Sequence, residues 1–333
     1  MSSISSISRL TPPLTPQSAH AAPASHANPT VAILMCTYNG QDFLEQQLQS
    51  FATQTHSNWK VVVSDDGSDD DTLPIVQRYQ ASWGQDKVTV RSGPQKGFAA
   101  NFLSLVCRAD IEADYFAYSD QDDVWEPAKL TTALNWLKSV PSDVPALYCS
   151  RTRLVDAQNK GIGLSQLFSK PPCFANALMQ NIAGGNTMVF NAAARALLRE
   201  AGQHVQVVAH DWWTYLVITG CNGRVMYDPN PTVLYRQHET NLVGVNGSMK
   251  ARLMSVRLLL AGKLIDWNDR NIDALLNLQH RLTPENREIA ELFTSARQRL
   301  LLPRLVGLKR SGVYRQTFFG NLGLLIVAIF RKI

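Results

Sequence analysis

Apolar runs and helix-spaced apolar positions alternate along most of the chain, and they predict alternating strands and helices. Strands are expected at the short apolar runs 31–36, 59–63, 88–90, 115–118, 146–149 and 224–227. Between them, apolar residues three and four positions apart predict helices over 41–55, 72–80, 98–107, 127–137 and 192–201. This order predicts an α/β fold: a mostly parallel sheet with helices on both faces.

The two ends of the chain depart from this alternation. Residues 1–29 are rich in Ser, Pro, Ala and Thr, and we expect them to form a disordered lead. From residue 248 onward the pattern is helical without further strands. We therefore expect an α/β domain at 30–247 and a helical C-terminal extension at 248–333, while residues 151–170 have a loop-like pattern.

The net charge of +5 is divided unequally between these parts. From Lys250 onward there are fifteen Lys and Arg against six Asp and Glu, so the preceding part is acidic overall. Such a basic extension predicts contact with an anionic surface. No helix-turn-helix, zinc-finger or RNA-binding motif is visible, so we expect no nucleic-acid partner. The five cysteines are scattered, which suits a reducing compartment.

An apolar run at 318–330, framed by basic residues, leaves two interpretations open. It is shorter than the ~20 residues that a membrane-spanning helix needs. A helix lying on an anionic membrane surface fits the run and its flanks. A helix that closes the core of the domain fits equally well.

Two clusters of acidic residues supply the candidate chemistry. Asp65 and Asp66 follow the predicted strand 59–63, and the triplet of Asp120, Asp122 and Asp123 follows the strand 115–118. Open α/β sheets bind ligands at the carboxyl ends of their strands. Acids gathered there repel one another unless a cation or a hydrogen-bonding ligand compensates them. We therefore expect a metal and nucleotide site. The alternatives are a simple turn at Asp66-Gly67-Ser68 and helix capping by the acids at 120–123.

Further motifs follow in a fixed order along the chain. They are Cys36-Thr37-Tyr38-Asn39-Gly40, Gly97 with Asn101, His210-Asp211-Trp212-Trp213 and Tyr235-Arg236-Gln237-His238. With the two acid clusters, this set resembles the family 2 glycosyltransferases of the GT-A fold, especially bacterial rhamnosyltransferase-like enzymes of surface polysaccharide synthesis. The resemblance implies sugar transfer from a nucleotide donor, with Mg²⁺ or Mn²⁺ stabilising the leaving diphosphate.

The resemblance also implies roles for individual residues. Asp122 is the expected direct metal ligand, Asp120 would face the ribose or the metal's waters, and Asp123 could share either role. His238 would complete the metal shell if it is not simply exposed. Asp65 would accept the ring N–H of uracil or thymine. The residues expected around the donor nucleotide are Thr37, Tyr38, Asn39, Asp65, Asp66, Asp120 and Arg236, the arginine against the diphosphate.

If the reaction inverts the sugar carbon, a carboxylate must deprotonate the acceptor hydroxyl. The resemblance assigns this role to Asp211 at a helix start, where an N-cap role is the alternative. His210 is expected to be a packing or hydrogen-bonding neighbour. Gly184-Gly185-Asn186 would let the backbone pass close to the donor sugar, or would simply make a tight turn.

Together these inferences predict a metal-dependent, inverting glycosyltransferase. It would move a deoxyhexose such as rhamnose from a UDP- or dTDP-sugar to a growing cell-surface glycan, free or lipid-linked. A cytoplasmic location is expected, with peripheral attachment to the inner membrane left open. A sugar nucleotidyltransferase would need a Gly-rich loop with Arg or Lys, which residues 37–41 lack. A non-catalytic scaffold would not need Asp120, Asp122 and Asp211 together.

Overall fold

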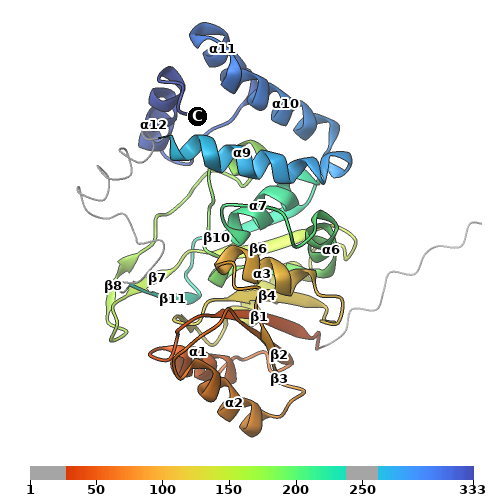
Figure 1. The fold of residues 1–333 in the computed structure, drawn as a ribbon, viewed down its shortest axis with the longest axis vertical. Coiled ribbons are helices and arrows are strands. Elements are labelled where there is room, and N and C mark those ends of the chain that lie inside the picture. The colour runs from red at the N-terminus through yellow and green to blue at the C-terminus, as the bar shows by residue number, and fades with distance from the viewer. Residues whose placement is uncertain (1–27, 238–261) are drawn as a thin grey trace, which may run out of the picture.

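The computed structural model describes residues 28–237 and 262–333 (Figure 1). The lead predicted at 1–29 lies outside the described residues apart from its last two. His238 and the predicted boundary at 247 and 248 also lie outside them.

Seven strands form the central sheet in the order β10-β6-β9-β4-β1-β2-β3. They are β1 (Val31–Thr37), β2 (Trp59–Asp65), β3 (Val88–Ser92), β4 (Tyr115–Ser119), β6 (Ala146–Ser150), β9 (Val189–Asn191) and β10 (Arg224–Asp228). The pairs β1–β2, β1–β4, β2–β3 and β6–β10 are parallel, whereas β9 runs antiparallel to β4 and β6. The prediction of a mostly parallel sheet is confirmed.

Strand β1 shows why these residues form a central strand. All seven of its residues are buried, as expected for a strand covered on both faces. Successive side chains point to opposite faces, so Leu34 packs in one core with Phe102, while Ile33 packs in the other with Leu48. Each such large apolar side chain contributes roughly 1.5–3 kcal/mol when fully buried.

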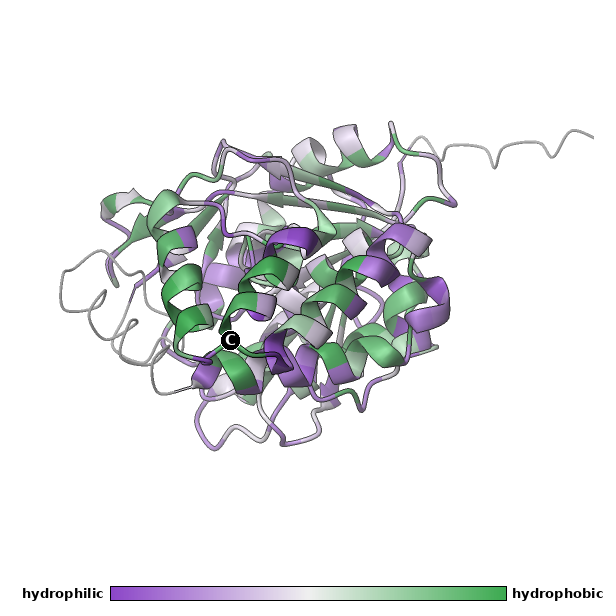
Figure 2. Ribbon diagram, turned by 90° about the horizontal axis from the view of Figure 1, so that it is seen from above, coloured by the Kyte–Doolittle hydropathy of each residue, from purple (hydrophilic) through white to green (hydrophobic). Residues whose placement is uncertain are grey.

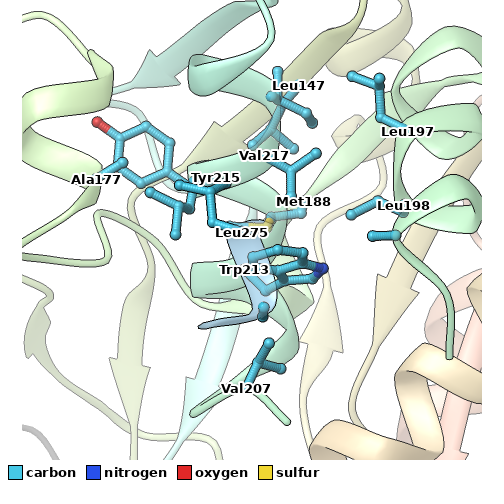
Figure 3. Close-up of a cluster of buried hydrophobic side chains, with 14 of the residues drawn as sticks. Leu147, Ala177, Met188, Leu197, Leu198, Val207, Trp213, Tyr215, Val217 and Leu275 are labelled. Atoms are coloured by element: carbon cyan, nitrogen blue, oxygen red, sulfur yellow. The ribbon is translucent and has the colours of Figure 1, made fainter. Parts of the chain in front are cut away.

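Helices cover both faces of the sheet (Figure 1), as predicted. One face packs against α1 (Leu44–Ala52), α2 (Thr72–Trp83) and α4 (Lys129–Leu137). The other packs against α3 (Phe98–Cys107), α5 (Phe174–Ala177), α6 (Ala192–Ala201) and α7 (His210–Gly220). Figure 3 shows the second core around Trp213 of α7.

A second sheet, in the order β5-β11-β7-β8, lies beside the first. Its strands are β5 (Val124–Trp125), β7 (Arg153–Val155), β8 (Gly161–Leu164) and β11 (Val233–Arg236). The loop predicted at 151–170 is therefore wrong in part, since it contains β7 and β8. Every residue of β8 is exposed, so no buried apolar pattern marks this strand in the sequence.

The described part of the predicted extension is helical. It contains α9 (Lys263–Leu276), the short 3-10 helix η2 (Gln279–Arg281), α10 (Pro284–Gln298), α11 (Leu301–Ser311) and α12 (Phe318–Ile329). Leu275 of α9 and Val327 of α12 belong to the same buried core as Trp213, so these helices pack onto the α/β part. In the described residues, no helix combines the length and apolar character required to cross a bilayer.

Candidate functional site

The loops that follow β1, β2 and β4 begin side by side at one edge of the sheet. Thr37, at the end of β1, is in register with Asp65 at the end of β2. Met35 of β1 is in register with Ser119, the last residue of β4. Since these strands are parallel, the two acid clusters meet at the same edge, where ligands bind in such sheets.

Asp65 is buried and its carboxylate is occupied by the protein itself. It accepts hydrogen bonds from Thr37 Oγ1 at 2.7 Å and from Ser68 Oγ at 2.6 Å. It also accepts from the backbone N–H groups of Ser68 at 2.8 Å and Gly67 at 3.2 Å. Four acceptances match the roughly four lone-pair sites of an ionised carboxylate. The described contacts therefore give Asp65 and Thr37 the task of fixing the loop after β2.

The neighbouring Asp66 is less buried and ties a different loop to the same edge. Its carboxylate accepts from the backbone N–H groups of Gln95 at 2.6 Å and Gly97 at 2.9 Å, just before α3. Gly97 has a φ of +85°, a conformation that favours glycine. Asn101 exchanges two hydrogen bonds with Ser64 at the end of β2, which accounts for the Gly97 and Asn101 motif.

The turn after β1 is held by the second acidic loop. The side-chain amide of Gln121 accepts from Tyr38 N at 2.8 Å and donates to Tyr38 O at 2.9 Å. Asn39, at a positive φ of 47°, accepts from Asp69 N at 3.0 Å. The Tyr38 ring remains 60% exposed, so it offers a stacking face beside the loop.

The carboxylate of Asp120 is affected by the negative charges of two other aspartates. Burial, together with the charges of Asp122 and Asp211, raises the pKa of Asp120 to about 8. Burial and the nearby carboxylates also raise the pKa of Tyr235. Like charges held this close disfavour ionisation of one another, and a cation would remove that penalty. Asp211, far along the chain, is therefore close enough to the loop of Asp120 and Asp122 to act on it electrostatically.

Asp123, in contrast, is fully buried and has internal partners. It accepts from the side-chain amide of Asn186 and, at 3.1 Å, from the backbone N–H of Arg236. These contacts give Asp123 a structural role, so it does not share the ligand roles that were left open for it. Helix capping is also excluded for the acid cluster, because the N-cap residue of α4 is Ala128 and no side chain caps it.

Arg236, which was predicted to contact the diphosphate, makes internal contacts in this structure. Its side chain is 1% exposed and stacks 4.4 Å from the ring centre of Phe43. Its guanidinium donates to Asp122 O at 2.8 Å, Ala157 O at 2.9 Å and Gln46 Oε1 at 2.8 Å. Arg236 thus supports the backbone of the acidic loop from behind.

Asp211 lies in the first turn of α7, but the N-cap residue there is Ala209, so the simple capping role does not apply. Its carboxylate accepts from Gly185 N at 3.1 Å and Trp212 N at 2.6 Å. Burial raises the pKa of Asp211 to about 6, although these bonds and one from Asn181 oppose the rise. The group is therefore a carboxylate near neutral pH that can still accept a proton.

The Gly184-Gly185-Asn186 segment positions Asp211 through the N–H of Gly185 and Asp123 through the side chain of Asn186. Its structure is the 3-10 helix η1 (Gly185–Thr187), which immediately precedes β9. A Cβ atom at Gly185 would lie 2.3 Å from His210 Nε2, so the backbone approaches that ring as only glycine can. His210 is buried, stacks 3.7 Å from Phe102, and burial lowers its pKa to about 3, which confirms a neutral packing residue.

The donor groups of the site fit a hard divalent cation. In residues 28–237 and 262–333, no three His, Cys, Asp or Glu side chains are arranged to hold a metal ion by themselves. Mg²⁺ is usually held by one or two carboxylates together with substrate phosphates and water. Asp120 and Asp122 match that requirement.

Sequence reasoning did not predict the roles of three residues that shape the site. Gln121 joins the two loops, Asn186 holds Asp123, and Gly185 holds Asp211. The spacing of Gly184-Gly185-Asn186 was the available signal, but it indicated only a turn or a close approach.

A mostly parallel sheet whose carboxyl edge gathers two acidic loops, with a helix-borne carboxylate near them, is typical of an α/β enzyme that binds its ligand at this edge. Residues 32–201 match the family model described as glycosyl transferase family 2. The chain belongs to this family and is a glycosyltransferase of the GT-A fold, as the motifs predicted.

Individual relatives agree with this assignment. The chain is 32% identical over 236 residues to dTDP-rhamnosyl transferase RfbG of Shigella flexneri, which covers 68% of this chain and 78% of that protein. It is 28% identical over 113 residues to the putative glycosyltransferase EpsE of Bacillus subtilis (strain 168), covering 34% and 40% respectively. The solved structure of GalNAc-T7 with UDP, GalNAc and Mn²⁺ aligns with a TM-score of 0.52 and 10% identity, covering 91% of this chain and 58% of that chain. At that identity the likeness concerns the fold alone.

Proposed function

We propose that this enzyme transfers a deoxyhexose, with rhamnose as the first candidate, from a dTDP- or UDP-sugar to a hydroxyl group of a growing surface glycan. The observation that carries the proposal is the placement of the two acidic loops at one edge of the sheet, with Asp211 close enough to Asp120 to raise its pKa. The similarity to a protein named as a dTDP-rhamnosyl transferase supports the choice of donor.

The base of the donor would bind at the loops after β1 and β2. The exposed ring of Tyr38 would stack on the pyrimidine. Asp66 is better suited than Asp65 to accept the ring N–H, because Asp65 already accepts four hydrogen bonds within the protein. Thr37 and Asn39 would act through the loop that they hold.

The diphosphate would bind at Asp120 and Asp122 through a divalent cation. When bound, the cation acts as a Lewis acid that stabilises the charge on the departing diphosphate. The described residues would supply two carboxylate ligands and a rigid loop, because Arg236 donates to the backbone carbonyl of Asp122 and Asn186 donates to the carboxylate of Asp123. His238 as a third ligand remains a prediction outside the described residues.

Asp211 would take the proton of the acceptor hydroxyl as that oxygen attacks the sugar carbon, which gives inversion. A base works best when its pKa is close to the working pH, and burial brings Asp211 to about 6. The N–H groups of Gly185 and Trp212 orient the carboxylate.

Calorimetric titration of the full chain with UDP and dTDP, with and without Mn²⁺, tests the proposal. Asp122→Ala should abolish the metal-dependent part of binding, whereas Asp143→Ala, an exposed aspartate in the turn before β6, should leave it unchanged. Incubation with dTDP-rhamnose should then release dTDP in an Asp211-dependent manner. Absence of nucleotide binding under every metal condition would refute a transferase function at this site.

A further inference from the structure

Helix α12 is apolar on two opposite faces, and only one of them is covered. Leu324, Val327 and Ala328 pack into the core of the protein. On the other side, Phe318, Leu322, Leu325 and Ile329 are exposed at the spacing i, i+4, i+7 and i+11, which places them in one stripe along the helix. Figure 2 shows the C-terminal helices from this end of the molecule, with extended hydrophobic segments.

Neighbouring side chains widen this stripe. Phe319, Ile326 and Phe330 are exposed on the same side of α12, and Phe318 and Phe319 are 77% and 78% exposed. We call these exposed side chains of α12 and of Phe330, directly after it, the outer stripe. Contiguous apolar patches of this kind mark interaction sites on monomers.

The outer stripe is held in a fixed position. Arg304 of α11 is buried and donates to Ala328 O at 2.7 Å and Arg299 O at 2.6 Å, which joins α11 to the end of α12. Before α12, Arg315 donates to Met179 O at 3.1 Å. The helix is therefore presented by the fold as a rigid surface element.

The charge of the C-terminal segment indicates which kind of partner this surface binds. From Leu292 to Ile333 there is no Asp or Glu, whereas there are eight Lys and Arg. Lys309 and Arg310 are exposed at the end of α11, and Arg331 is exposed directly after α12. A second copy of this surface would bring basic residues against basic residues, because a two-fold contact uses the same patch twice. Anionic lipid headgroups complement the basic rim, and acyl chains complement the apolar centre.

We propose that the outer stripe docks α12 on an anionic membrane surface, with the helix lying in the interface. The twelve residues of α12 extend about 18 Å at 1.5 Å per residue, which is too short to cross the ~30 Å hydrocarbon core. Docking in this orientation also brings the segment before α12 to the membrane. That segment bonds to Met179 and Gln180, next to Asn181, which contacts Asp211. The acceptor side of the site would then face a lipid-linked glycan.

Vesicle flotation of the full chain tests this surface without any donor or acceptor, so its result is independent of the proposed transferase activity. Wild-type protein should bind phosphatidylcholine vesicles that contain phosphatidylglycerol more tightly than pure phosphatidylcholine vesicles, and added salt should weaken the binding. The triple variant Phe319→Gln, Leu325→Gln, Phe330→Gln should bind at least about tenfold more weakly, since binding scales with the apolar area inserted.

Matched variants separate the stripe from general surface effects. Ile162→Gln, Leu164→Gln, Leu276→Gln removes three exposed apolar side chains from β8 and α9 and should bind like wild type. Both triple variants should keep the wild-type melting temperature, because the replaced side chains are exposed. Wild-type binding by the stripe variant, or no binding by the wild type, would overturn the proposal. Light scattering that shows a dimer lost in the stripe variant, without vesicle binding, would assign the stripe to a second copy instead.

Discussion

Replacing Gly185 with alanine tests the positioning of the candidate base more directly than removing the base. The new Cβ would lie 2.3 Å from His210 Nε2, about 1 Å short of an ordinary contact of 3.4 Å. His210 cannot swing away easily, because it is buried and stacked on Phe102. The backbone of η1 must therefore shift, and it carries the N–H that bonds Asp211 at 3.1 Å.

The magnitude follows from these contacts. Forcing one extra carbon into a packed site costs typically about 1–3 kcal/mol of folding stability. A displacement of about 1 Å at a catalytic group lowers the rate about a hundredfold. We expect Gly185→Ala to lower kcat to that extent, to leave metal-dependent nucleotide binding nearly unchanged, and to reduce the free energy of unfolding by about 2 kcal/mol.

The assay is release of dTDP from dTDP-rhamnose at saturating donor, paired with urea unfolding. Gly161→Ala is the matched control, because a Cβ there meets no atom within 4 Å. Gly185→Ala and His210→Ala combined should cost less stability than the sum of the two single changes, since the clash is then removed. A Gly185→Ala variant with wild-type kcat and an unchanged unfolding midpoint would refute the reasoning.

Three further predictions concern neighbouring residues. The ratio kcat/KM should fall as the pH drops through about 6, since below that value Asp211 is protonated and cannot accept a proton from the acceptor. A pH profile that is flat from 5 to 8 in both the wild type and Asp211→Asn would contradict this. Arg236→Met leaves three internal acceptors without their donor and should cost about 3 kcal/mol in urea unfolding, compared with almost nothing for the exposed Arg224→Met. Asn186→Ala removes a hydrogen bond to the buried carboxylate of Asp123 and should cost about 1.5–3 kcal/mol, a loss that thermal melts would show.

The strands and helices of the central layers could be predicted because their signal is local. The apolar run 31–36 of β1 and the helix-spaced apolar residues of α3 and α6 indicate burial within a single segment. β8 could not be predicted, since its exposed residues gain their conformation from pairing with β7. That pairing leaves no apolar alternation in the sequence.

The location of the site could also be predicted, but the tasks of its residues could not be fully separated. Asp65 and Asp66 are adjacent in sequence, yet their surroundings differ. The carboxylate of Asp65 is buried and accepts hydrogen bonds from loop N–H groups and hydroxyls, whereas Asp66 is only partly buried. Only the path of the loop decides between them. The internal contacts of Arg236 likewise could not be predicted, because its acceptors lie 79 to 190 residues away in the sequence.

The reversed direction of β9 has a consequence for how the site can diversify. At the carboxyl edge of the sheet, each parallel strand ends and is followed by a loop, so only the loop after such a strand lies at this edge. β9 is antiparallel to β4, with Val189 opposite Ala117, so the loop before β9 lies at this edge instead. That stretch is not part of a helical crossover, whose length is fixed by the distance back across the sheet. Insertions before Gly184 could therefore reshape the pocket for a different sugar or acceptor, while the framework of helices and strands remains unchanged.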